Sequence, residues 1–568
     1  MFLPTTKEEA AALGWAALDV ILVSGDTYID SSYIGVAVIG KNLVKAGYRV
    51  GIIAQPDTRD GSDISRLGEP RLFWGVTAGC MDSMIANYTA TKKPRRKDDL
   101  TPGGENTRRP DRASIVYTNL IRRHFKNTVP IVLGGIEASL RRISHYDFWS
   151  DRVRRSILFD AKADILVYGM GEKPVAALAA RLSSGESVTG IRGICYISSD
   201  KPDGYINLPG HDAVRQDKSA FRAMFRVFYE NNDPASAKGM VQRQDTRYLV
   251  HNPPPPLPTS EALDDIHEAG YEREVAPFYR RFGPVRAMET LRFSLVTHRG
   301  CYGECHFCAI AVHQGRTIVQ RSEASILREA REMSRHPLFK GIIQDVGGPT
   351  ANMYGMECDR KKEKGPCRHR HCLTPEPCRH LPVNHAAQIR LLEKLRQVPG
   401  VRKVFVSSGI RHDLILADRE AGEQYLEALV RHHISGQLKI APEHSENHVL
   451  ALMGKPGIEK TREFIRRFRE KNRQMGEKQF LTCYFIAAHP GCTLQDMHRL
   501  KDFARAELKF RPEQVQIFTP APATIATMMY YTQSAYPEER PVFVEKTTAG
   551  KERQKQAVMP GQRQKRIS

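Results

Sequence analysis

The sequence has no run of 18 apolar residues, and its amino terminus has no basic stretch leading into an apolar one, because Glu8, Glu9 and Asp19 interrupt the pattern. These absences argue against a membrane-spanning helix and a secretory leader. We therefore expect a cytoplasmic protein that makes no membrane contact. Cysteine is scarce in the first half, where only Cys80 and Cys195 precede residue 301. Seven of the eleven cysteines lie in the range 301–378, and without an export signal this clustering favours metal ligation over disulfides.

The composition shows no acidic excess. Lys and Arg number 85 against 64 Asp and Glu, a formal net charge of +21. This balance makes RNA, phosphorylated metabolites and other anions plausible partners without choosing among them. Two basic segments, residues 92–112 and 141–155, interrupt the first half of the chain. For the first, a solvated insertion is favoured over a nucleic-acid contact, since charge runs are usually solvated.

The chain of 568 residues exceeds what one hydrophobic core usually serves. In residues 1–200, apolar strand-like runs alternate with helix-like stretches, a pattern that predicts a doubly wound α/β domain. Residues 201–286 show no clear sheet pattern and contain four consecutive prolines, so we interpret them as a connector. Six strand–helix alternations in residues 287–535 predict a partial (βα)6 barrel with a Cys-rich insertion at 350–380. Residues 536–568 are polar and basic, which predicts a disordered tail. The six barrel strands are expected near 293–297, 341–346, 403–407, 437–441, 480–486 and 514–518.

A cysteine triplet follows the first expected barrel strand. Cys301, Cys305 and Cys308 form a C-x3-C-x2-C loop with glycines on both sides of Cys301. An iron–sulfur cluster normally takes four thiolate ligands, so a compact triplet leaves one iron open to another ligand. Structural zinc is the alternative, but zinc sites favour paired C-x2-C knuckles. The spacing therefore favours a cluster with an open iron.

This loop resembles that of the radical S-adenosylmethionine (radical SAM) enzymes, which also carry an aromatic residue directly before the last cysteine, as Phe307 stands here. The resemblance implies a [4Fe-4S] cluster on Cys301, Cys305 and Cys308, with the amino and carboxylate groups of SAM on the fourth iron. Reduction would then cleave SAM to methionine and a 5′-deoxyadenosyl radical that abstracts a substrate hydrogen. An electron donor such as flavodoxin or ferredoxin is implied as a partner.

Further motifs fall at the expected carboxyl ends of barrel strands, where barrel active sites lie. Gly347 and Gly348 resemble a glycine motif that approaches the methionine end of SAM, although its acidic residue is absent. For the remaining candidates, the competing explanation is that these residues only form turns and loops and contact no ligand. The candidate SAM contacts are Phe307, Gly347, Gly348, Ser407, Ser408, Arg411 and Glu443.

The likeness is closer still to the YgiQ-type radical SAM proteins and covers nearly the whole chain. The stretches that carry it include RGCYGECHFCAI at 299–310, DVGGPTANMYG at 345–355, KIAPEH at 439–444 and YFIAAHPGC at 484–492. The resemblance indicates the chemistry and leaves the substrate and the catalytic residues open. Within this class, an RNA-modifying enzyme similar to methylthiotransferases is the alternative, although no RNA-binding module is visible at the carboxyl end. Outside the radical SAM class, two alternatives stay open: a non-catalytic iron–sulfur sensor and a nucleic-acid-binding protein without catalysis.

A second cysteine group lies in the barrel insertion. Four cysteines within 21 residues, accompanied by histidines such as His369, are too dense to be chance. They suit either zinc or an auxiliary iron–sulfur cluster, and the sequence does not separate the two. These candidate ligands are Cys358, Cys367, Cys372 and Cys378.

A doubly wound domain before such a barrel resembles the cobalamin-binding arrangement, whose D-x-H-x-x-G motif supplies a histidine to cobalt. The corresponding stretch, Asp30 to Gly35, has Ser32 where that histidine would be. Cobalt ligation through this position is excluded. Cobalamin bound without a protein ligand remains as an alternative, but we do not expect it, because many unrelated functions share this sheet topology. A degenerate domain that covers the barrel or binds substrate is preferred, with 134–137 as a stretch that meets a ligand or forms a tight turn.

Overall fold

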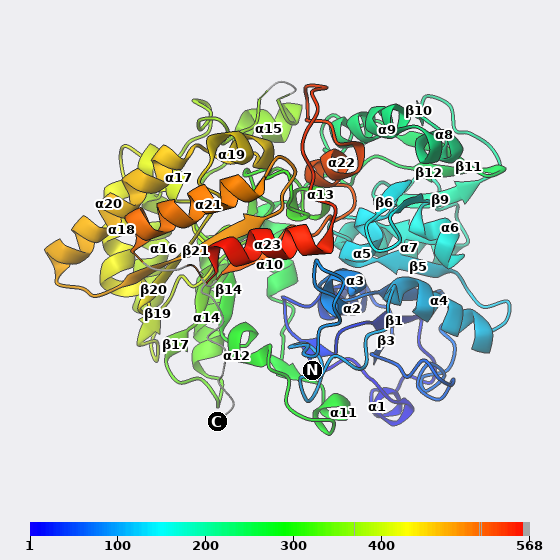
Figure 1. Ribbon diagram of the computed structural model, residues 1–568. Coiled ribbons are helices and arrows are strands. Elements are labelled where there is room, and N and C mark those ends of the chain that lie inside the picture. Colours follow the sequence, from blue (N-terminus) through cyan, green and yellow to red (C-terminus); the bar gives the residue numbers. More distant parts are fainter. Residues whose placement is uncertain (368–369, 510–511, 513, 560–568) are drawn as a thin grey trace, which may run out of the picture.

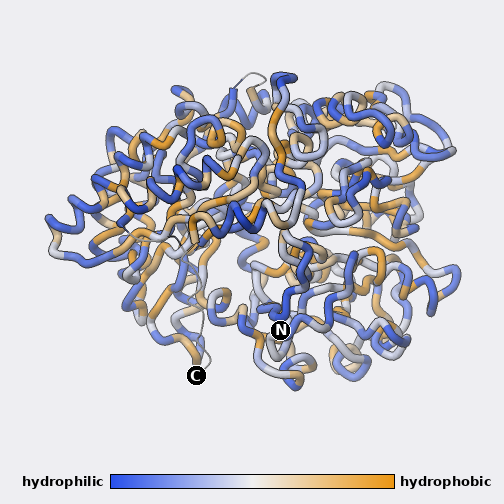
Figure 2. The backbone as a smooth tube through the Cα atoms, viewed as in Figure 1, coloured by the Kyte–Doolittle hydropathy of each residue, from blue (hydrophilic) through white to orange (hydrophobic). Residues whose placement is uncertain are grey.

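The computed structural model describes residues 1–367, 370–509, 512 and 514–559, and it has two α/β parts (Figure 1). A large sheet with its helices forms the amino-terminal part, and a partial barrel forms the second. The strands and the inner faces of the helices carry most of the apolar residues (Figure 2). Among the described residues, no helix combines the length and apolar character needed to cross a membrane.

The amino-terminal sheet has nine strands in the order β10-β11-β12-β9-β8-β5-β4-β1-β3. Five neighbouring strands pair in parallel. Chain order reverses between β1 and β4, since β3 pairs on one side of β1 and the later strands follow on the other. In open α/β sheets such a switch point opens a crevice at the carboxyl ends of the strands, where ligands bind. The parallel strands are β1 (Val20–Ser24), β3 (Val50–Ala54), β4 (Phe73–Thr77), β5 (Ile131–Gly134) and β8 (Ile165–Val167).

Helices cover both faces of this sheet, as the doubly wound prediction requires. Every residue of β1 is buried, because its alternate side chains enter two separate cores. Leu22 packs with α2 (Gly35–Lys45) and α7 (Glu172–Ser184). Ile21 belongs to the opposite core, with residues of α4 (Ala113–His124) and α6 (Ile157–Ala161). The expected α/β fold of this part is confirmed.

The predicted connector is wrong for much of its length, because three of its segments extend the same sheet. β9 (Ile194–Ser198) pairs antiparallel with β8 and β12, and β10 and β11 complete the edge. Polar residues within these strands hide the apolar alternation. The buried Gln242 and Gln244 accept hydrogen bonds of 3.0 Å from the backbone of Ser144 and Ser156. The added strands are β10 (Ile206–Leu208), β11 (Met240–Gln244) and β12 (Arg247–His251).

The second part has the six expected barrel strands in parallel order, with a core of its own. The second strand is split at Gln344 into β17 (Ile342–Ile343) and β18 (Asp345–Gly347). The other barrel strands are β14 (Ser294–Val296), β19 (Lys403–Val404), β20 (Gln437–Glu443), β21 (Phe480–Ala487) and β22 (Val515–Ile517). The outer helices are α14 (Glu323–Ser334), α16 (Ala386–Arg396), α17 (His412–Ala417), α18 (Gly422–Ala428), α19 (Asn447–Met453), α20 (Ile458–Met475) and α21 (Leu494–Phe503).

The carboxyl-terminal segment is ordered through residue 559, and it joins the two parts (Figure 1). α22 (Ile525–Thr532) packs into the core of the amino-terminal sheet, and α23 (Thr548–Val558) lies against α21 and β22 of the barrel. The disordered-tail prediction is therefore wrong for α23, while residues 560–568 lie outside the described ones. Composition misled because Lys551 is buried: its Nζ donates to the Tyr530 hydroxyl at 2.9 Å and lies over the Phe148 ring.

Candidate functional site

The cysteine triplet lies in the loop between β15 (His298–Arg299) and β16 (Val319–Gln320), which form an antiparallel pair after β14. Gly300 starts the loop with φ +81°, and a Cβ there would lie 2.1 Å from the Thr317 carbonyl oxygen. Only glycine fits both the conformation and the space. The pairing therefore fixes both ends of the loop at the carboxyl end of the first barrel strand.

The three thiols are free and partly exposed. A Cβ added at Gly303 would lie 3.2 Å from the Cys301 Sγ and 3.5 Å from the Cys305 Sγ, so both sulfurs lie beside the same glycine. A single zinc ion holds its thiolates about 3.8 Å apart, given a Zn–S bond of about 2.3 Å. In the described part of the chain, the triplet does not bring its three ligand atoms within 4.8 Å of one another. Three thiols on one short loop match the three protein ligands of a cluster with one open iron.

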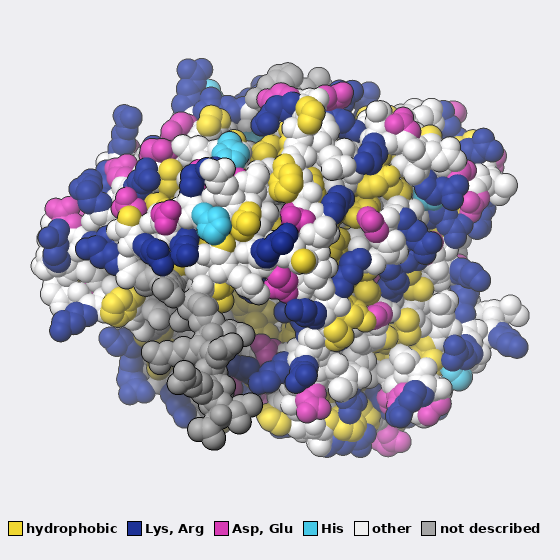
Figure 3. Space-filling view, in the orientation of Figure 1, with side chains coloured by type: hydrophobic (Ala, Val, Ile, Leu, Met, Phe, Trp, Pro, Cys, Tyr) yellow, Lys and Arg dark blue, Asp and Glu magenta, His cyan; other side chains and the backbone are white. Residues whose placement is uncertain are grey.

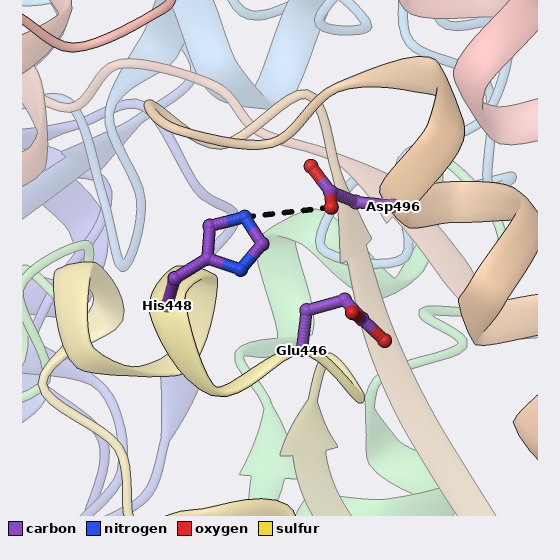
Figure 4. A group of neighbouring side chains, drawn as sticks. All are labelled: Glu446, His448 and Asp496. Atoms are coloured by element: carbon purple, nitrogen blue, oxygen red, sulfur yellow. Dashed lines mark ion pairs between the residues drawn. The ribbon is translucent and has the colours of Figure 1, made fainter.

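Glu446, His448 and Asp496 do lie that close, but they form an ion-pair network (Figure 4). The Arg499 Nε lies 2.7 Å from a Glu446 oxygen, and the same guanidinium also pairs with Asp496. Asp496 in addition caps α21 through Thr493. Because both carboxylates already have a cationic partner, this group is not a candidate metal centre.

Arg411 places a positive charge beside the triplet. Its Nη1 lies 3.6 Å from the Cys305 Sγ, and two further nitrogens donate to Asp413 at 2.8 and 2.6 Å. Burial opposes its charge, yet Asp413 keeps the pKa of the guanidinium above its ordinary value. The arginine is therefore a fixed cation beside the Cys305 sulfur.

Glu443 ends β20 at a β-bulge, with φ +72°. Such a conformation is uncommon for a residue other than glycine. Burial raises the pKa of its carboxyl group to about 7, although Lys455, with its Nζ 3.9 Å away, and Arg411 favour the charged form. The carboxyl group therefore changes charge readily near neutral pH.

The other candidate SAM contacts have different surroundings. Gly347 and Gly348 line a cavity, and a Cβ on Gly348 would lie 2.7 Å from the His298 carbonyl oxygen. Ser407 and Ser408 donate their backbone N–H groups to Asp345, and the Ser408 hydroxyl donates there as well. Of the two serines, only Ser408 lines the cavity.

Phe307, the aromatic residue before Cys308, lies between the two large cores. Its ring meets the edge of the His489 ring, with the centroids 6.2 Å apart. It does not line the cavity, and neither do Arg411 and Glu443. Phe307 therefore packs the cysteine loop between the two parts of the molecule.

The cavity has a volume of about 530 Å³ and lies between the two parts of the molecule. On one side it is lined by residues at the carboxyl ends of β1, β4, β5 and β8, which include the switch point, and on the other by β14, β15 and β18. Several of its residues were missed from the sequence, because they gather only once the strand order is known. They include Tyr33, Cys80, His267 and His298.

The stretch from Asp30 to Gly35 lies at this cavity. Asp30 pairs with Lys41 at 3.0 Å, while Ser32 lines the cavity and its buried hydroxyl has no hydrogen-bond partner among the described residues. Cys80, three residues after β4, contributes an exposed side chain to the same wall. The segment after β2 (Ile29–Asp30) and the loop after β4 thus each supply a polar group to this wall.

In the stretch 134–137, Gly134, Gly135 and Ile136 line the cavity, whereas Glu137 does not. The buried Glu137 carboxylate accepts backbone hydrogen bonds from Ser83 at 2.8 Å and Ser114 at 3.1 Å. The glycines therefore leave room at the wall, and the glutamate holds two neighbouring segments.

Two family profiles divide the chain at the junction of its parts. The one described as "Radical SAM N-terminal" matches residues 2–294, and the one described as "Radical SAM superfamily" matches residues 295–504. The UPF0313 protein of Fusobacterium nucleatum is 53% identical over 558 residues, with 98% of each chain covered. The chain belongs to the UPF0313 family of radical SAM proteins. It is thus an enzyme of the radical SAM superfamily, as the sequence resemblance implies.

Other relatives of this UPF0313 protein come from distant organisms. The UPF0313 protein of Thermotoga maritima is 51% identical, with 94% of each chain covered. That of Methanocella arvoryzae is 50% identical, with 93% of this chain and 88% of the relative covered. The likeness therefore extends over both parts of the molecule.

Among solved structures, the radical SAM methyltransferase TsrM of Kitasatospora setae, with cobalamin and a [4Fe-4S] cluster bound, has a TM-score of 0.51 and 15% identity. The match covers 95% of this chain and 85% of TsrM. The expectation against cobalamin is wrong. It depended on Ser32 in place of a histidine, yet a protein with this two-part fold is seen with cobalamin bound.

Proposed function

We propose that this UPF0313 protein binds a [4Fe-4S] cluster on Cys301, Cys305 and Cys308 and reductively cleaves SAM. The observation that carries the proposal is the position of the three thiols, on one fixed loop at the carboxyl end of the first barrel strand. That loop directly follows His298 and Arg299, which line the cavity of about 530 Å³. When bound, the cluster and SAM supply a 5′-deoxyadenosyl radical, and the cavity is where a substrate would meet it.

The chain's own residues have distinct proposed roles. Arg411, fixed by Asp413, stabilises the anionic thiolate of Cys305. Gly347 and Gly348 leave the backbone open toward the cavity, where it can accept from the amino group of SAM. Ser408 extends that wall, whereas Ser407 donates its hydroxyl to the Gln344 carbonyl and acts as a brace.

The proposal includes a small electron-transfer protein such as flavodoxin or ferredoxin as donor. An RNA substrate gains little support from the basic segments, since Arg109 and Arg142 are buried and hydrogen-bonded inside the molecule. On the face drawn in Figure 3, Lys and Arg side chains are dispersed among acidic and apolar ones. The class of substrate therefore stays open in the proposal.

Anaerobic reconstitution with iron and sulfide, followed by dithionite and SAM, tests the proposed cleavage. We expect 5′-deoxyadenosine, formed only when the cluster is reduced. Electron paramagnetic resonance checks that the cluster accepts the electron and that SAM changes its spectrum. If SAM does not change the spectrum of the reduced cluster and no 5′-deoxyadenosine forms, the result contradicts the proposal and favours a sensing role.

We also propose that the central cavity binds cobalamin. The support is the cavity's place at the switch point, the fold shared with TsrM, and a wall rich in glycine. A Cβ at Gly35 would meet nothing within 4 Å, so the backbone there lies open to a large planar ligand. The unpartnered Ser32 hydroxyl and the Cys80 thiol offer polar contacts on the same wall.

Hydroxocobalamin should bind the protein and protect Cys80 from alkylation by N-ethylmaleimide, because the thiol lines the cavity. Gly35→Leu fills open space there, so we expect affinity to fall at least about tenfold, or about 1.4 kcal/mol. Absorption titration measures binding, and mass spectrometry locates the modified cysteine. Ser184→Leu, at an exposed position ending α7, is the matched control. Equal affinity in all three proteins, with Cys80 unprotected, would exclude this site.

A further inference from the structure

The Cys-rich insertion is fixed to the loop that carries the cysteine triplet. The Tyr302 hydroxyl accepts a hydrogen bond of 3.1 Å from the backbone of Cys358. The Lys361 Nζ lies 3.0 Å from the Glu304 carboxylate, and both side chains are buried. Tyr302 and Glu304 lie between Cys301 and Cys305 in the sequence. The insertion therefore contacts the triplet loop through residues of the C-x3-C-x2-C motif.

The insertion shares an apolar cluster with the triplet. The buried Cys372 is a member of this cluster, and the partly buried Cys301, Cys358 and Cys378 pack against it. The insertion and the triplet therefore share one apolar neighbourhood, in which Cys372 is buried and the other cysteines are partly exposed. The other buried members of the cluster are Tyr302, Ile318, Met353, Met356, Leu373, Leu381 and Leu414, and Val383 packs against them.

Basic side chains contact two of the four thiols. The Lys361 Nζ lies 3.3 Å from the Cys372 Sγ, and the Arg360 Nη1 lies 2.6 Å from the Cys367 Sγ. Both bases belong to α15 (Asp359–Lys364), whose amino-terminal cap is Cys358. A cation beside a sulfur compensates the negative charge that a metal-bound thiolate carries. One short helix thus supplies a ligand candidate and two compensating charges.

The surroundings of the thiols favour one of the two metals that the sequence leaves open. Four thiolates on one zinc ion lie about 3.8 Å apart. Among the described residues, no three of these cysteines bring their sulfurs within 4.8 Å of one another, and all four are free. A larger inorganic core holds its ligands further apart. An apolar shell with hydrogen bonds to sulfur is also typical of iron–sulfur sites.

We propose that Cys358, Cys367, Cys372 and Cys378 ligate a second iron–sulfur cluster, held against the first through Tyr302 and Glu304. The ligand set is complete within the insertion, so this cluster needs neither SAM nor the triplet. The inference deepens the proposed function, yet it stands on separate residues. Its failure is therefore distinguishable from failure of SAM cleavage.

The test uses the full chain with Cys301, Cys305 and Cys308 all replaced by alanine. After anaerobic reconstitution we expect this triple variant to retain about four irons and four sulfides, with absorbance near roughly 400 nm. Adding Cys372→Ala should remove most of that iron. Adding Cys483→Ala instead, at a buried thiol outside the insertion, should leave it unchanged. Circular dichroism confirms that each variant is folded.

Two results would overturn the second cluster. One is a folded triple variant with about one zinc and no iron, and the other is a folded variant with no metal at all. Mössbauer spectra of the unsubstituted protein supply an independent count, expected at about eight irons per chain. If the triple variant keeps its iron while the unsubstituted protein fails to cleave SAM, the second cluster stands and the proposed activity falls.

Discussion

Replacing Cys301, Cys305 and Cys308 by alanine together should abolish SAM cleavage, with 5′-deoxyadenosine at the level of a protein-free control. Each thiol is a proposed ligand of the one cluster that has an open iron, so no remaining site can take its place. Loss of this cluster should also lower the bound iron by about half, because the insertion retains its own. Deoxyadenosine measured by chromatography, with iron and sulfide per chain, checks both expectations.

The matched control is Cys483→Ala, at a buried thiol in β21 of the same barrel. It should retain cleavage, because its thiol lies in the barrel core and outside the cysteine loop. Deoxyadenosine production by the folded triple variant would disprove the assignment of the triplet. Loss of activity in both variants would instead point to general damage by cysteine removal, which circular dichroism would reveal.

The fold could be predicted where hydrophobic periodicity is strong. β1 is buried along its whole length, and the six barrel strands lie close to the expected ranges. Prediction failed where polar side chains are satisfied inside the molecule. Gln242 and Gln244 sit in β11 with hydrogen-bond partners from distant loops, and Lys551 lies over aromatic rings. Composition alone does not reveal partners that distant segments supply, such as Ser156, which lies 88 residues before Gln244.

The site could be predicted only where its residues are adjacent in the sequence. The triplet is one short motif with glycines on both sides of Cys301, and it is therefore recognisable from the sequence alone. The cavity wall is different, since Ser32 and Cys80 lie in loops 48 positions apart in the sequence and meet at one cavity only in the folded chain. Ser407 shows the opposite error, because a serine at a strand end resembles a ligand contact, while its hydroxyl donates to the Gln344 carbonyl.

The basic segment at residues 92–112 shows how charge can mislead. The sequence predicts a solvated insertion, but Arg109 of this segment is buried. Its guanidinium pairs with Asp26 and lies 3.1 Å from Asp98. The same arginine donates to the Gly25 carbonyl at 3.2 Å. Asp26 in turn accepts a hydrogen bond of 2.5 Å from the backbone of Cys80. The segment therefore braces the loops that flank the switch point.

Arg109→Leu should lower the free energy of unfolding by about 3–5 kcal/mol, because it leaves Asp26 and Asp98 buried without their cation. Urea denaturation under anaerobic conditions measures this change. The wall of the cavity should also loosen, since Asp26 holds the backbone of Cys80, and N-ethylmaleimide should then modify Cys80 faster. Arg108→Leu, at an exposed position one residue earlier, should change stability by no more than about 0.5 kcal/mol.

The pH dependence separates a lost ion pair from lost packing. Burial already raises the pKa of Asp26, and Arg109 opposes that rise. Without the arginine, the folded-state pKa of Asp26 rises further, so the folded variant binds a proton that the unfolded chain releases. Its stability deficit should therefore be largest at pH 8 and shrink toward pH 5. Two results would contradict this role of the charge: a loss of stability of equal size from pH 5 to pH 8, or an equal loss in Arg108→Leu. Either would show that Arg109 contributes through packing.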